Sequence, residues 1–204
     1  MLAIVPSTEP SDAVSDQAPT HPWDEPTELV GARAVASILH LHLRYAEQVV
    51  RAGLAGPGYA TARGRLVTRA AVDALARRQR RDEADLPRAL VLRSGPPERV
   101  GDRWTGVHTA MPDAAITECA LRWWALAEPA RLDGRLVVVA VAGFAVWAGR
   151  VTGHARDGRR VALLADRATP RDAEAEVYYA SRLVLPRGAV TVRVGDVAVR
   201  GAVR

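Results

Sequence analysis

The segment AVASILHLHLRYAEQVVRAGLAGPGYATARGRLVTRAAVDALARRQRR, residues 34–81, decides the fold of the N-terminal part of the chain. Two apolar series recur in it at helical spacing: Val35, Ile38 and Leu39, then Ala46, Val49 and Val50. Residues 40–42 interrupt the periodicity between the two series. The spacing therefore predicts two short helices joined by a tight turn, with the second helix crossing the first.

The residues after the second helix predict a ribbon and a third helix. Gly53 is placed to adopt the left-handed conformation that ends a helix. The glycines of GPGY and of RGRLV indicate a hairpin. Thr68 is a candidate N-cap for a helix over 69–81, whose Val72 and Leu75 would face inward. Helix, turn, helix, hairpin and helix form an arrangement that presents one helix to a DNA groove.

This segment resembles the winged helix-turn-helix domain of the excisionase and MerR type. The resemblance rests on ASILHLH (36–42), Ala46, VV (49–50), GL (53–54), RLVTR (65–69) and VDAL (72–75). In that family the turn usually carries glycine where this chain has His40, and serine where it has His42. Histidine tolerates a positive φ better than most side chains. The resemblance implies a domain over about residues 29–81 that binds double-stranded DNA.

The exposed face of the second helix carries the candidate DNA-contacting residues. In a recognition helix the N-terminal exposed positions reach base edges, where arginine pairs with guanine and glutamine with adenine. Arg44, Tyr45 and Gln48 are therefore the expected readers, and Arg51, one turn later, is expected on phosphate. In the predicted wing, two arginines flank Gly64, where they would enter a minor groove or hold the backbone. The predicted DNA-binding set is His42, Arg44, Tyr45, Gln48, Arg51, Arg63 and Arg65.

The basic excess is concentrated in the same segment. Residues 1–28 carry six acidic side chains and no basic one, whereas residues 29–81 carry ten arginines against two carboxylates. The remainder has eighteen arginines against fifteen carboxylates, and the whole chain of 204 residues has a net charge of +5. A protein that binds phosphates needs such a concentration of positive charge. A solvated helix face gives the same pattern, so the charge indicates DNA binding only together with the motif on the same residues. All basic side chains are arginine, as is common in proteins of GC-rich bacteria.

A reversal of charge after the third helix predicts a domain boundary. Three acidic residues occur within 82–85, and Pro87 follows them. We expect four regions: a disordered acidic tail over 1–27, the winged helix-turn-helix over 28–82, a linker over 83–87 and a second domain over 88–204. No heptad pattern follows, so the coiled-coil dimerisation of MerR-type regulators is not expected.

Residues 88–204 predict a β-rich domain. The strongest strand is LVVVAVA (136–142), with a continuation or partner over 144–152 after Gly143. RDGRR (156–160) predicts a hairpin turn, Asp113 is a candidate cap for a helix through residue 127, and 174–185 fits a strand or a helix. The expected fold class is α+β, with the winged helix-turn-helix followed by a small, barrel-like β-rich domain with one or two helices. That domain loosely resembles small barrels of the PUA and ASCH type, which often bind RNA or altered bases.

The sequence carries no recognisable catalytic motif. It contains no lysine, so a phosphate-binding loop of the Walker type is excluded, and no nucleophile elbow occurs. His40 and His42 have no Cys or carboxylate set to complete a zinc site. His108 with Asp113 or Glu118 is a candidate acid-base set, but proximity in sequence does not bring side chains together. We therefore expect no enzyme, no cofactor and no metal.

Cysteine content and hydropathy bear on the compartment. Cys119 is the only cysteine, which excludes an internal disulfide and fits a reducing cytoplasm. The sequence has no run of about eighteen apolar residues, so no membrane span is expected. The first ten residues lack the basic residues with which a secretory signal starts. We expect a cytoplasmic protein with no membrane partner.

The combined expectation is a site-specific, double-stranded DNA-binding protein that acts in transcription regulation. Its second domain would sense, recruit or form a homo-oligomer through residues 88–204. One alternative is an excisionase-like factor that bends DNA, although such factors are usually little more than the winged domain. Another is an RNA or protein interaction module with a PUA-like barrel.

Overall fold

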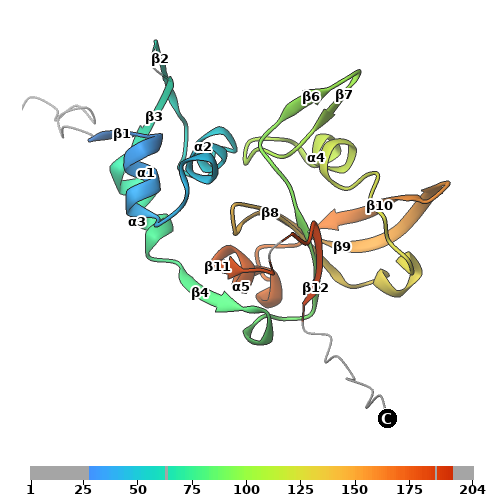
Figure 1. Ribbon diagram of the computed structural model, residues 1–204. Helices are drawn as coiled ribbons and strands as arrows, with labels where there is room; N and C mark the ends of the chain where they lie inside the picture. Colours follow the sequence, from blue (N-terminus) through green and yellow to red (C-terminus); the bar gives the residue numbers. More distant parts are fainter. Residues whose placement is uncertain (1–27, 63, 187, 195–204) are drawn as a thin grey trace, which may run out of the picture.

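The computed structural model describes residues 28–62, 64–186 and 188–194, which form an α+β structure (Figure 1). The expected acidic tail over 1–27 lies outside the described residues. An N-terminal module, residues 28–78, holds three helices and a small sheet in the order β1-β3-β2. Its elements are β1 (Leu29–Gly31), α1 (Ala32–Ile38), α2 (Leu43–Arg51), β2 (Tyr59–Thr61), β3 (Gly64–Thr68) and α3 (Arg69–Ala76).

The rest of the described chain forms the sheet unit, residues 79–194. Its main sheet has seven strands, in the order β12-β5-β8-β9-β11-β4, with β10 paired to β9. The strands are β4 (Gln79–Asp82), β5 (Ala89–Arg93), β8 (Leu136–Val141), β9 (Phe144–Asp157), β10 (Arg160–Arg167), β11 (Ser181–Val184) and β12 (Thr191–Val194). A separate hairpin is formed by β6 (Glu98–Val100) and β7 (Arg103–Thr105), and the helices are α4 (Asp113–Ala120) and α5 (Ala173–Tyr179). Two short 3-10 turns lie at Glu83–Asp85 and Pro129–Leu132.

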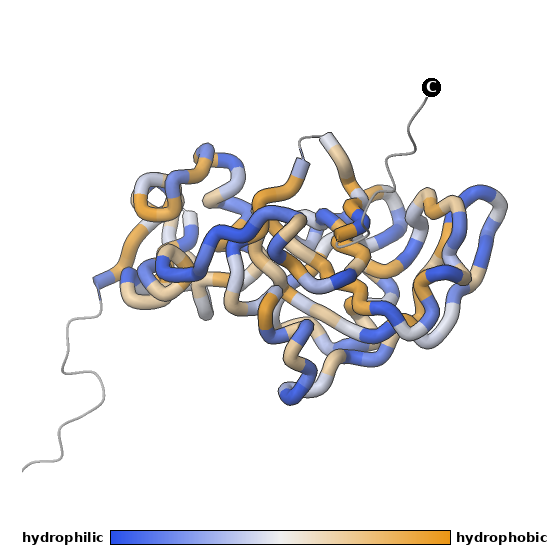
Figure 2. The backbone as a smooth tube through the Cα atoms, turned by 90° about the horizontal axis from the view of Figure 1, so that it is seen from below, coloured by the Kyte–Doolittle hydropathy of each residue, from blue (hydrophilic) through white to orange (hydrophobic). Residues whose placement is uncertain are grey.

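Strand β8 is apolar at every position because the sheet is covered on both faces. Alternate side chains of a strand point to opposite faces. Val137, Val139 and Val141 belong to one buried cluster, which also holds Ile116 of α4. Leu136, Val138 and Ala140 belong to the other, with Tyr178 of α5. Figure 2 shows the hydrophobic segments gathered in the middle of the sheet unit.

The structure confirms the predicted hairpin at RDGRR, and it shows that residues 144–152 pair with the strand 136–142 and do not continue it. Strands β8 and β9 pair antiparallel from Val141 and Phe144 outward, around a turn at Gly143, which has a φ of +86°. Strands β9 and β10 pair from Asp157 and Arg160, so RDGRR forms the turn between them. The segment 174–185, which fitted either type of element, contains both α5 and β11.

Three expectations about the elements are corrected. The third helix ends at Ala76 and does not reach residue 81, because residues 79–82 pair in parallel with β11 as strand β4. The helix expected over 113–127 ends at Ala120, after which Trp124 makes an isolated bridge to Val161. The main sheet is also not a barrel: among the described residues, its end strands β12 and β4 each pair with a single neighbour.

The residues of the expected boundary, 82–87, pack with the sheet unit. Strand β4 lies in the main sheet, and Leu86, in the expected linker, is buried against it. At the same time Phe144, the first residue of β9, is fully buried in the cluster that forms the core of the N-terminal module. The sheet unit therefore supplies part of the module's core.

No helix within the described residues is long and apolar enough to cross a membrane.

We predict that Phe144→Ala destabilises the module and the sheet unit together. The ring is fully buried, and its removal should cost about 3–5 kcal/mol. Thermal unfolding followed by circular dichroism should show one transition, displaced to lower temperature. Leu164→Ala, at a side chain of the same sheet that is 46% exposed, should change stability by no more than about 0.5 kcal/mol. Two separate transitions, of which only one moves, would contradict this coupling.

Candidate nucleic-acid interface

The turn between α1 and α2 is closed by a helix-ending motif centred on His40. The N–H of Leu41 donates to the carbonyl of Ala36 at 2.9 Å, and the N–H of His40 donates to the carbonyl of Ser37 at 3.3 Å. This pair of bonds is the Schellman motif, which requires a left-handed residue just after the helix cap. His40 has the required conformation, with a φ of +48°. The structure thus places histidine in the conformation that glycine usually supplies.

The start of α2 is capped by the second histidine of the turn. His42 has an extended backbone, and its Nδ1 accepts a hydrogen bond from the N–H of Arg44 at 3.4 Å. An N-cap acceptor satisfies one of the free N–H groups of the first turn. His42 is exposed, but its Nδ1 is used within the chain.

Helix α2 ends in the same way and is docked there onto the sheet unit. Gly53 has a φ of +73°, and Leu54 donates to the carbonyl of Val49 at 3.2 Å. A Cβ at Gly53 would lie 2.6 Å from the His108 ring. Thr109 donates from its N–H to Ala52 and from its hydroxyl to Gly53, at 3.0 and 3.1 Å. Close approach and backbone conformation both require glycine here.

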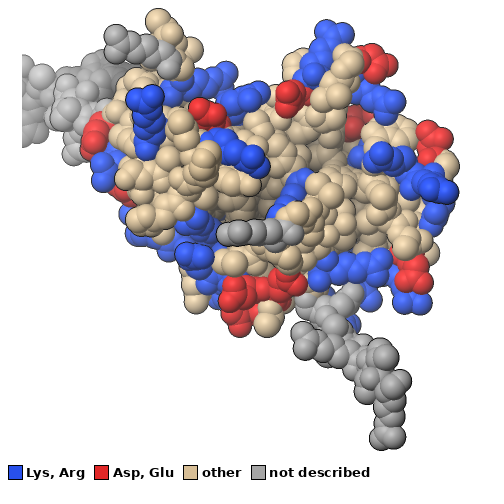
Figure 3. Space-filling model, viewed as in Figure 1, with Lys and Arg blue, Asp and Glu red and all other residues tan. Residues whose placement is uncertain are grey.

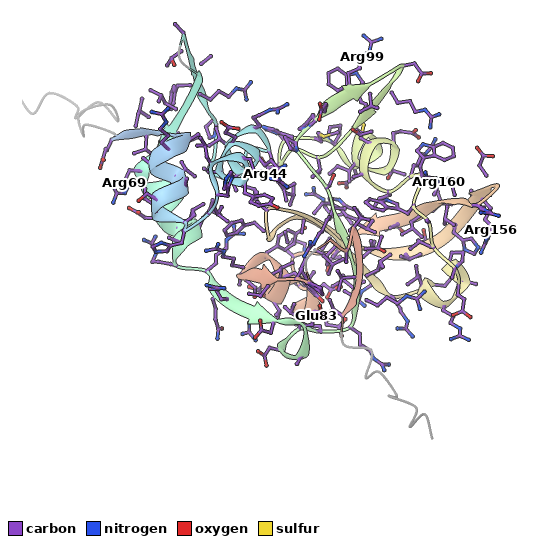
Figure 4. All side chains as sticks on the ribbon, in the orientation of Figure 1. Arg44, Arg69, Glu83, Arg99, Arg156 and Arg160 are labelled. Atoms are coloured by element: carbon purple, nitrogen blue, oxygen red, sulfur yellow. The ribbon has the colours of Figure 1, made fainter. Side chains whose placement is uncertain are left out.

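The inward and outward faces of α2 are those predicted, except at Gln48. Ala46, Val49 and Val50 are buried in the module core. Leu43, Arg44, Tyr45, Glu47 and Arg51 are exposed, and Gln48 is half-buried. Because the C-terminal end is docked, the N-terminal turns of α2 form its most accessible part. Figure 4 shows Arg44 on the side of the module that faces the sheet unit, and Arg69 on the opposite side.

Arg44 and Tyr45 form a pair on this face. The Arg44 Nη2 donates to the Tyr45 hydroxyl at 3.1 Å, and the guanidinium carbon lies 4.7 Å from the centroid of the Tyr45 ring. The contact with Tyr45 restrains the long Arg44 side chain and uses only one of its guanidinium donors. The remaining donors stay available for other partners.

The hairpin β2–β3 stands beside α2 (Figure 1). Arg65 is exposed on β3, opposite Ala60 of β2, and the Thr61 hydroxyl donates to the carbonyl of Gly64 at 2.8 Å. Arg63, the other arginine of the predicted wing, lies outside the described residues. The structure therefore brings Arg44, Tyr45, Gln48 and Arg51 together on one helix, with Arg65 on the adjacent hairpin.

Several arginines of the basic segment are engaged elsewhere. Arg69 pairs with Asp73 and Glu28 at 3.1 and 3.4 Å. The guanidinium of Arg78 stacks over Phe144 at 5.8 Å, and burial lowers its pKa. Arg80 and Arg81 lie on β4, so the predicted basic end of the third helix is not formed. Figure 3 shows arginines spread over both the module and the sheet unit, with a group of carboxylates at the lower edge of this view.

The acid-base set considered from the sequence is not assembled. The Nδ1 of His108 accepts from the N–H of Ala110 at 3.0 Å. Asp113 binds the indole N–H of Trp147 at 3.0 Å and Arg167 at 2.8 Å, whereas Glu118 pairs with Arg122. Within the described part of the chain, no three His, Cys, Asp or Glu side chains are placed to hold a metal ion.

Sequence reasoning missed the arginine that fixes the turn. Arg182 of β11 donates from Nη1 to the carbonyl of Leu39 at 2.6 Å and from Nη2 to that of His40 at 3.4 Å. Its guanidinium also lies 5.7 Å from the centroid of Phe144. Burial, and then the positive charge of Arg80, lower the pKa of Arg182. No local pattern could have identified it, since its partners lie 143 and 142 residues away.

No protein-family model, curated protein or solved structure matches the chain.

We predict that His40→Val destabilises the protein and that His40→Gly does not. A left-handed conformation costs about 1–2 kcal/mol for ordinary residues, and a β-branched side chain tolerates it least. In chemical unfolding, the free energy of unfolding of His40→Val should be lower than that of the parent by about that amount. Glycine adopts the conformation freely, so His40→Gly should retain the parent's stability within about 1 kcal/mol. Equal losses in both variants would show that the imidazole, and not the backbone, is what the turn requires.

Proposed function

We propose that the chain binds double-stranded DNA at specific sites, through a winged helix-turn-helix formed by residues 29–76, and that it regulates transcription. The observation that carries the proposal is the outward face of α2. It presents Arg44, exposed in the first turn, and the half-buried Gln48 one turn later, on a helix whose other face is buried. An α-helix fits the major groove, and arginine and glutamine are the side chains that read guanine and adenine there.

The hairpin β2–β3 and the charge of the segment support the proposal. Arg65 is exposed on the hairpin, beside α2, in the position of a wing. Arginines that contact the sugar–phosphate backbone position a protein on the duplex, and those on base edges select the sequence. In this arrangement Arg44, Tyr45 and Gln48 read bases, and Arg51 and Arg65 hold phosphates. His42 starts the helix that carries the readers.

The size of the sheet unit favours a regulator over a DNA-bending excisionase. A bending factor needs little beyond the winged domain, whereas here the sheet unit is joined to the module by strand β4 and by the buried Phe144. Homo-oligomerisation through residues 88–204, and a place in the cytoplasm, stay predictions. If the experiments below show no specific duplex binding, the alternative is an interaction module that binds protein or RNA through α2.

The reader residues are tested by alanine substitution after selection of a preferred duplex from a random library. Arg44→Ala and Gln48→Ala should each cost about 1–3 kcal/mol on the selected duplex and little on random duplex, since base contacts carry the specificity. Arg65→Ala should weaken both duplexes alike, because phosphates are the same in every sequence. Fluorescence anisotropy measures these affinities.

The matched control for the reader residues is Arg159→Ala. Arg159 is exposed in the turn between β9 and β10, and its removal takes away the same charge from a site outside the module. Its affinity for both duplexes should stay close to that of the parent. Circular dichroism should be unchanged in all four variants. If Arg44→Ala and Gln48→Ala keep both affinity and site preference, α2 is not the reading helix.

We also predict a strong dependence of duplex affinity on salt. Arginine contacts to a handful of phosphates release condensed counterions on binding, so the affinity should fall by about two to four decades for a several-fold rise in salt. Anisotropy titrations at several salt concentrations measure the slope, which should be smaller in Arg65→Ala. A duplex affinity that is insensitive to salt would contradict phosphate binding by this segment.

A further inference from the structure

A cavity of about 770 Å³ lies in the sheet unit, and no residue of α2 lines it. It is bounded by the hairpin β6–β7, the segment that follows α4, and the ends of β5, β10 and β12. Its volume is within the range of about 300–1,000 Å³ that is usual for small-molecule sites. None of the residues assigned to duplex binding lines it.

Three tryptophans line this cavity, from a chain that has five. Trp104, on β7, is 58% exposed, and Trp123 and Trp124 follow α4 and are half-buried. The Trp124 indole N–H donates to the carbonyl of Ala120 at 2.8 Å, so its ring is fixed. A large exposed indole at the rim of a concave site offers a flat apolar surface to a ligand.

The wall around Trp123 is held in a strained conformation. Trp123 has a φ of +71°, in the left-handed region that bulky side chains rarely adopt. Two sets of bonds fix it: Arg160 donates to the carbonyl of Trp123 at 2.9 Å, and Trp124 exchanges both backbone hydrogen bonds with Val161. Strain of this kind persists only where the surrounding structure imposes it, and it is concentrated at ligand sites.

Arginines supply the second chemical feature of the cavity. Arg93, Arg103, Arg122 and Arg160 line it, against the carboxylates Glu98 and Glu118. Glu118 pairs with Arg122, and the Arg103 guanidinium lies 5.2 Å from the centroid of the Trp123 ring. The wall therefore carries two more cations than carboxylates, and one of the cations is stacked beside an indole.

We propose that this cavity binds a nucleotide, with its base on the exposed indole of Trp104 and its phosphate on Arg103. Indoles stack on the flat face of any base, and guanidinium pairs with phosphate through parallel hydrogen bonds. An inorganic anion makes no use of three indoles, and a neutral aromatic makes no use of the excess arginines. The same chemistry fits a free mononucleotide and an unpaired nucleotide of a single strand. The site is distinct from the duplex-binding face and stands whether or not that face reads DNA.

Isothermal titration calorimetry on the full chain tests the proposal. The probes are the four nucleoside 5′-monophosphates, the matching nucleosides, inorganic phosphate and a single-stranded hexanucleotide. Trp104→Ala should weaken nucleotide binding about tenfold or more, because the loss of one aromatic side chain that stacks on a base usually has an effect of this size. Arg103→Ala should weaken the binding of a monophosphate and leave that of the nucleoside nearly unchanged. Both side chains are exposed, so neither substitution removes core packing.

Arg99→Ala is the matched control, because Arg99 is exposed on β6 of the same hairpin and does not line the cavity (Figure 4). Its nucleotide affinity should equal that of the parent. Binding of monophosphates identifies a free nucleotide as the ligand, and binding of the hexanucleotide alone identifies a strand. The proposal is overturned if neither binds, if inorganic phosphate binds as tightly as the nucleotides, or if Trp104→Ala and Arg103→Ala bind like Arg99→Ala.

Discussion

The hydrogen bonds from Arg182 to the carbonyls of Leu39 and His40 are the contact on which the arrangement of the molecule depends. A helix end leaves carbonyl groups without partners, and a guanidinium is well suited to satisfy them. Arg182 comes from β11, whose neighbours are β9 and β4, and its guanidinium stacks on Phe144 inside the module core. One side chain thus holds the helix–turn–helix against the sheet unit.

The direction of α2 is fixed at its C-terminal end by the loop that leaves β7. The loop that follows β7 lines the cavity with Gly106, and its Thr109 binds the C-terminal end of α2. Gly106 has a φ of +91°, and a Cβ there would lie 2.2 Å from the carbonyl oxygen of Pro96, so the path of this loop is sharply constrained. The start of α2 is set by His42 and its end by Thr109. A helix docked in this way presents Arg44 and Gln48 in one orientation, which would lower the entropic cost of the proposed duplex binding.

The candidate reading face was accessible to sequence reasoning because its geometry is local. Helical periodicity places Ala46, Val49 and Val50 inward wherever the helix packs, and the structure buries all three. Thr68, the expected cap of the third helix, accepts from the N–H of Ala71 at 3.3 Å. The residues beyond Ala76 were assigned wrongly, because QRRD has the composition of a helix end and acquires its strand conformation from pairing with β11.

The sequence by itself determined the elements whose hydrogen bonds close within a few residues: α1, the left-handed turn at His40, α2, and the hairpin β8–β9. Only the tertiary structure decided how these elements are joined. The partners of Arg182 are 143 and 142 residues away, and the cavity draws its wall from β5, β7, β10 and β12. Periodicity and turn chemistry report on neighbours along the chain. Contacts between distant segments follow from the packing of whole faces, which no local pattern encodes.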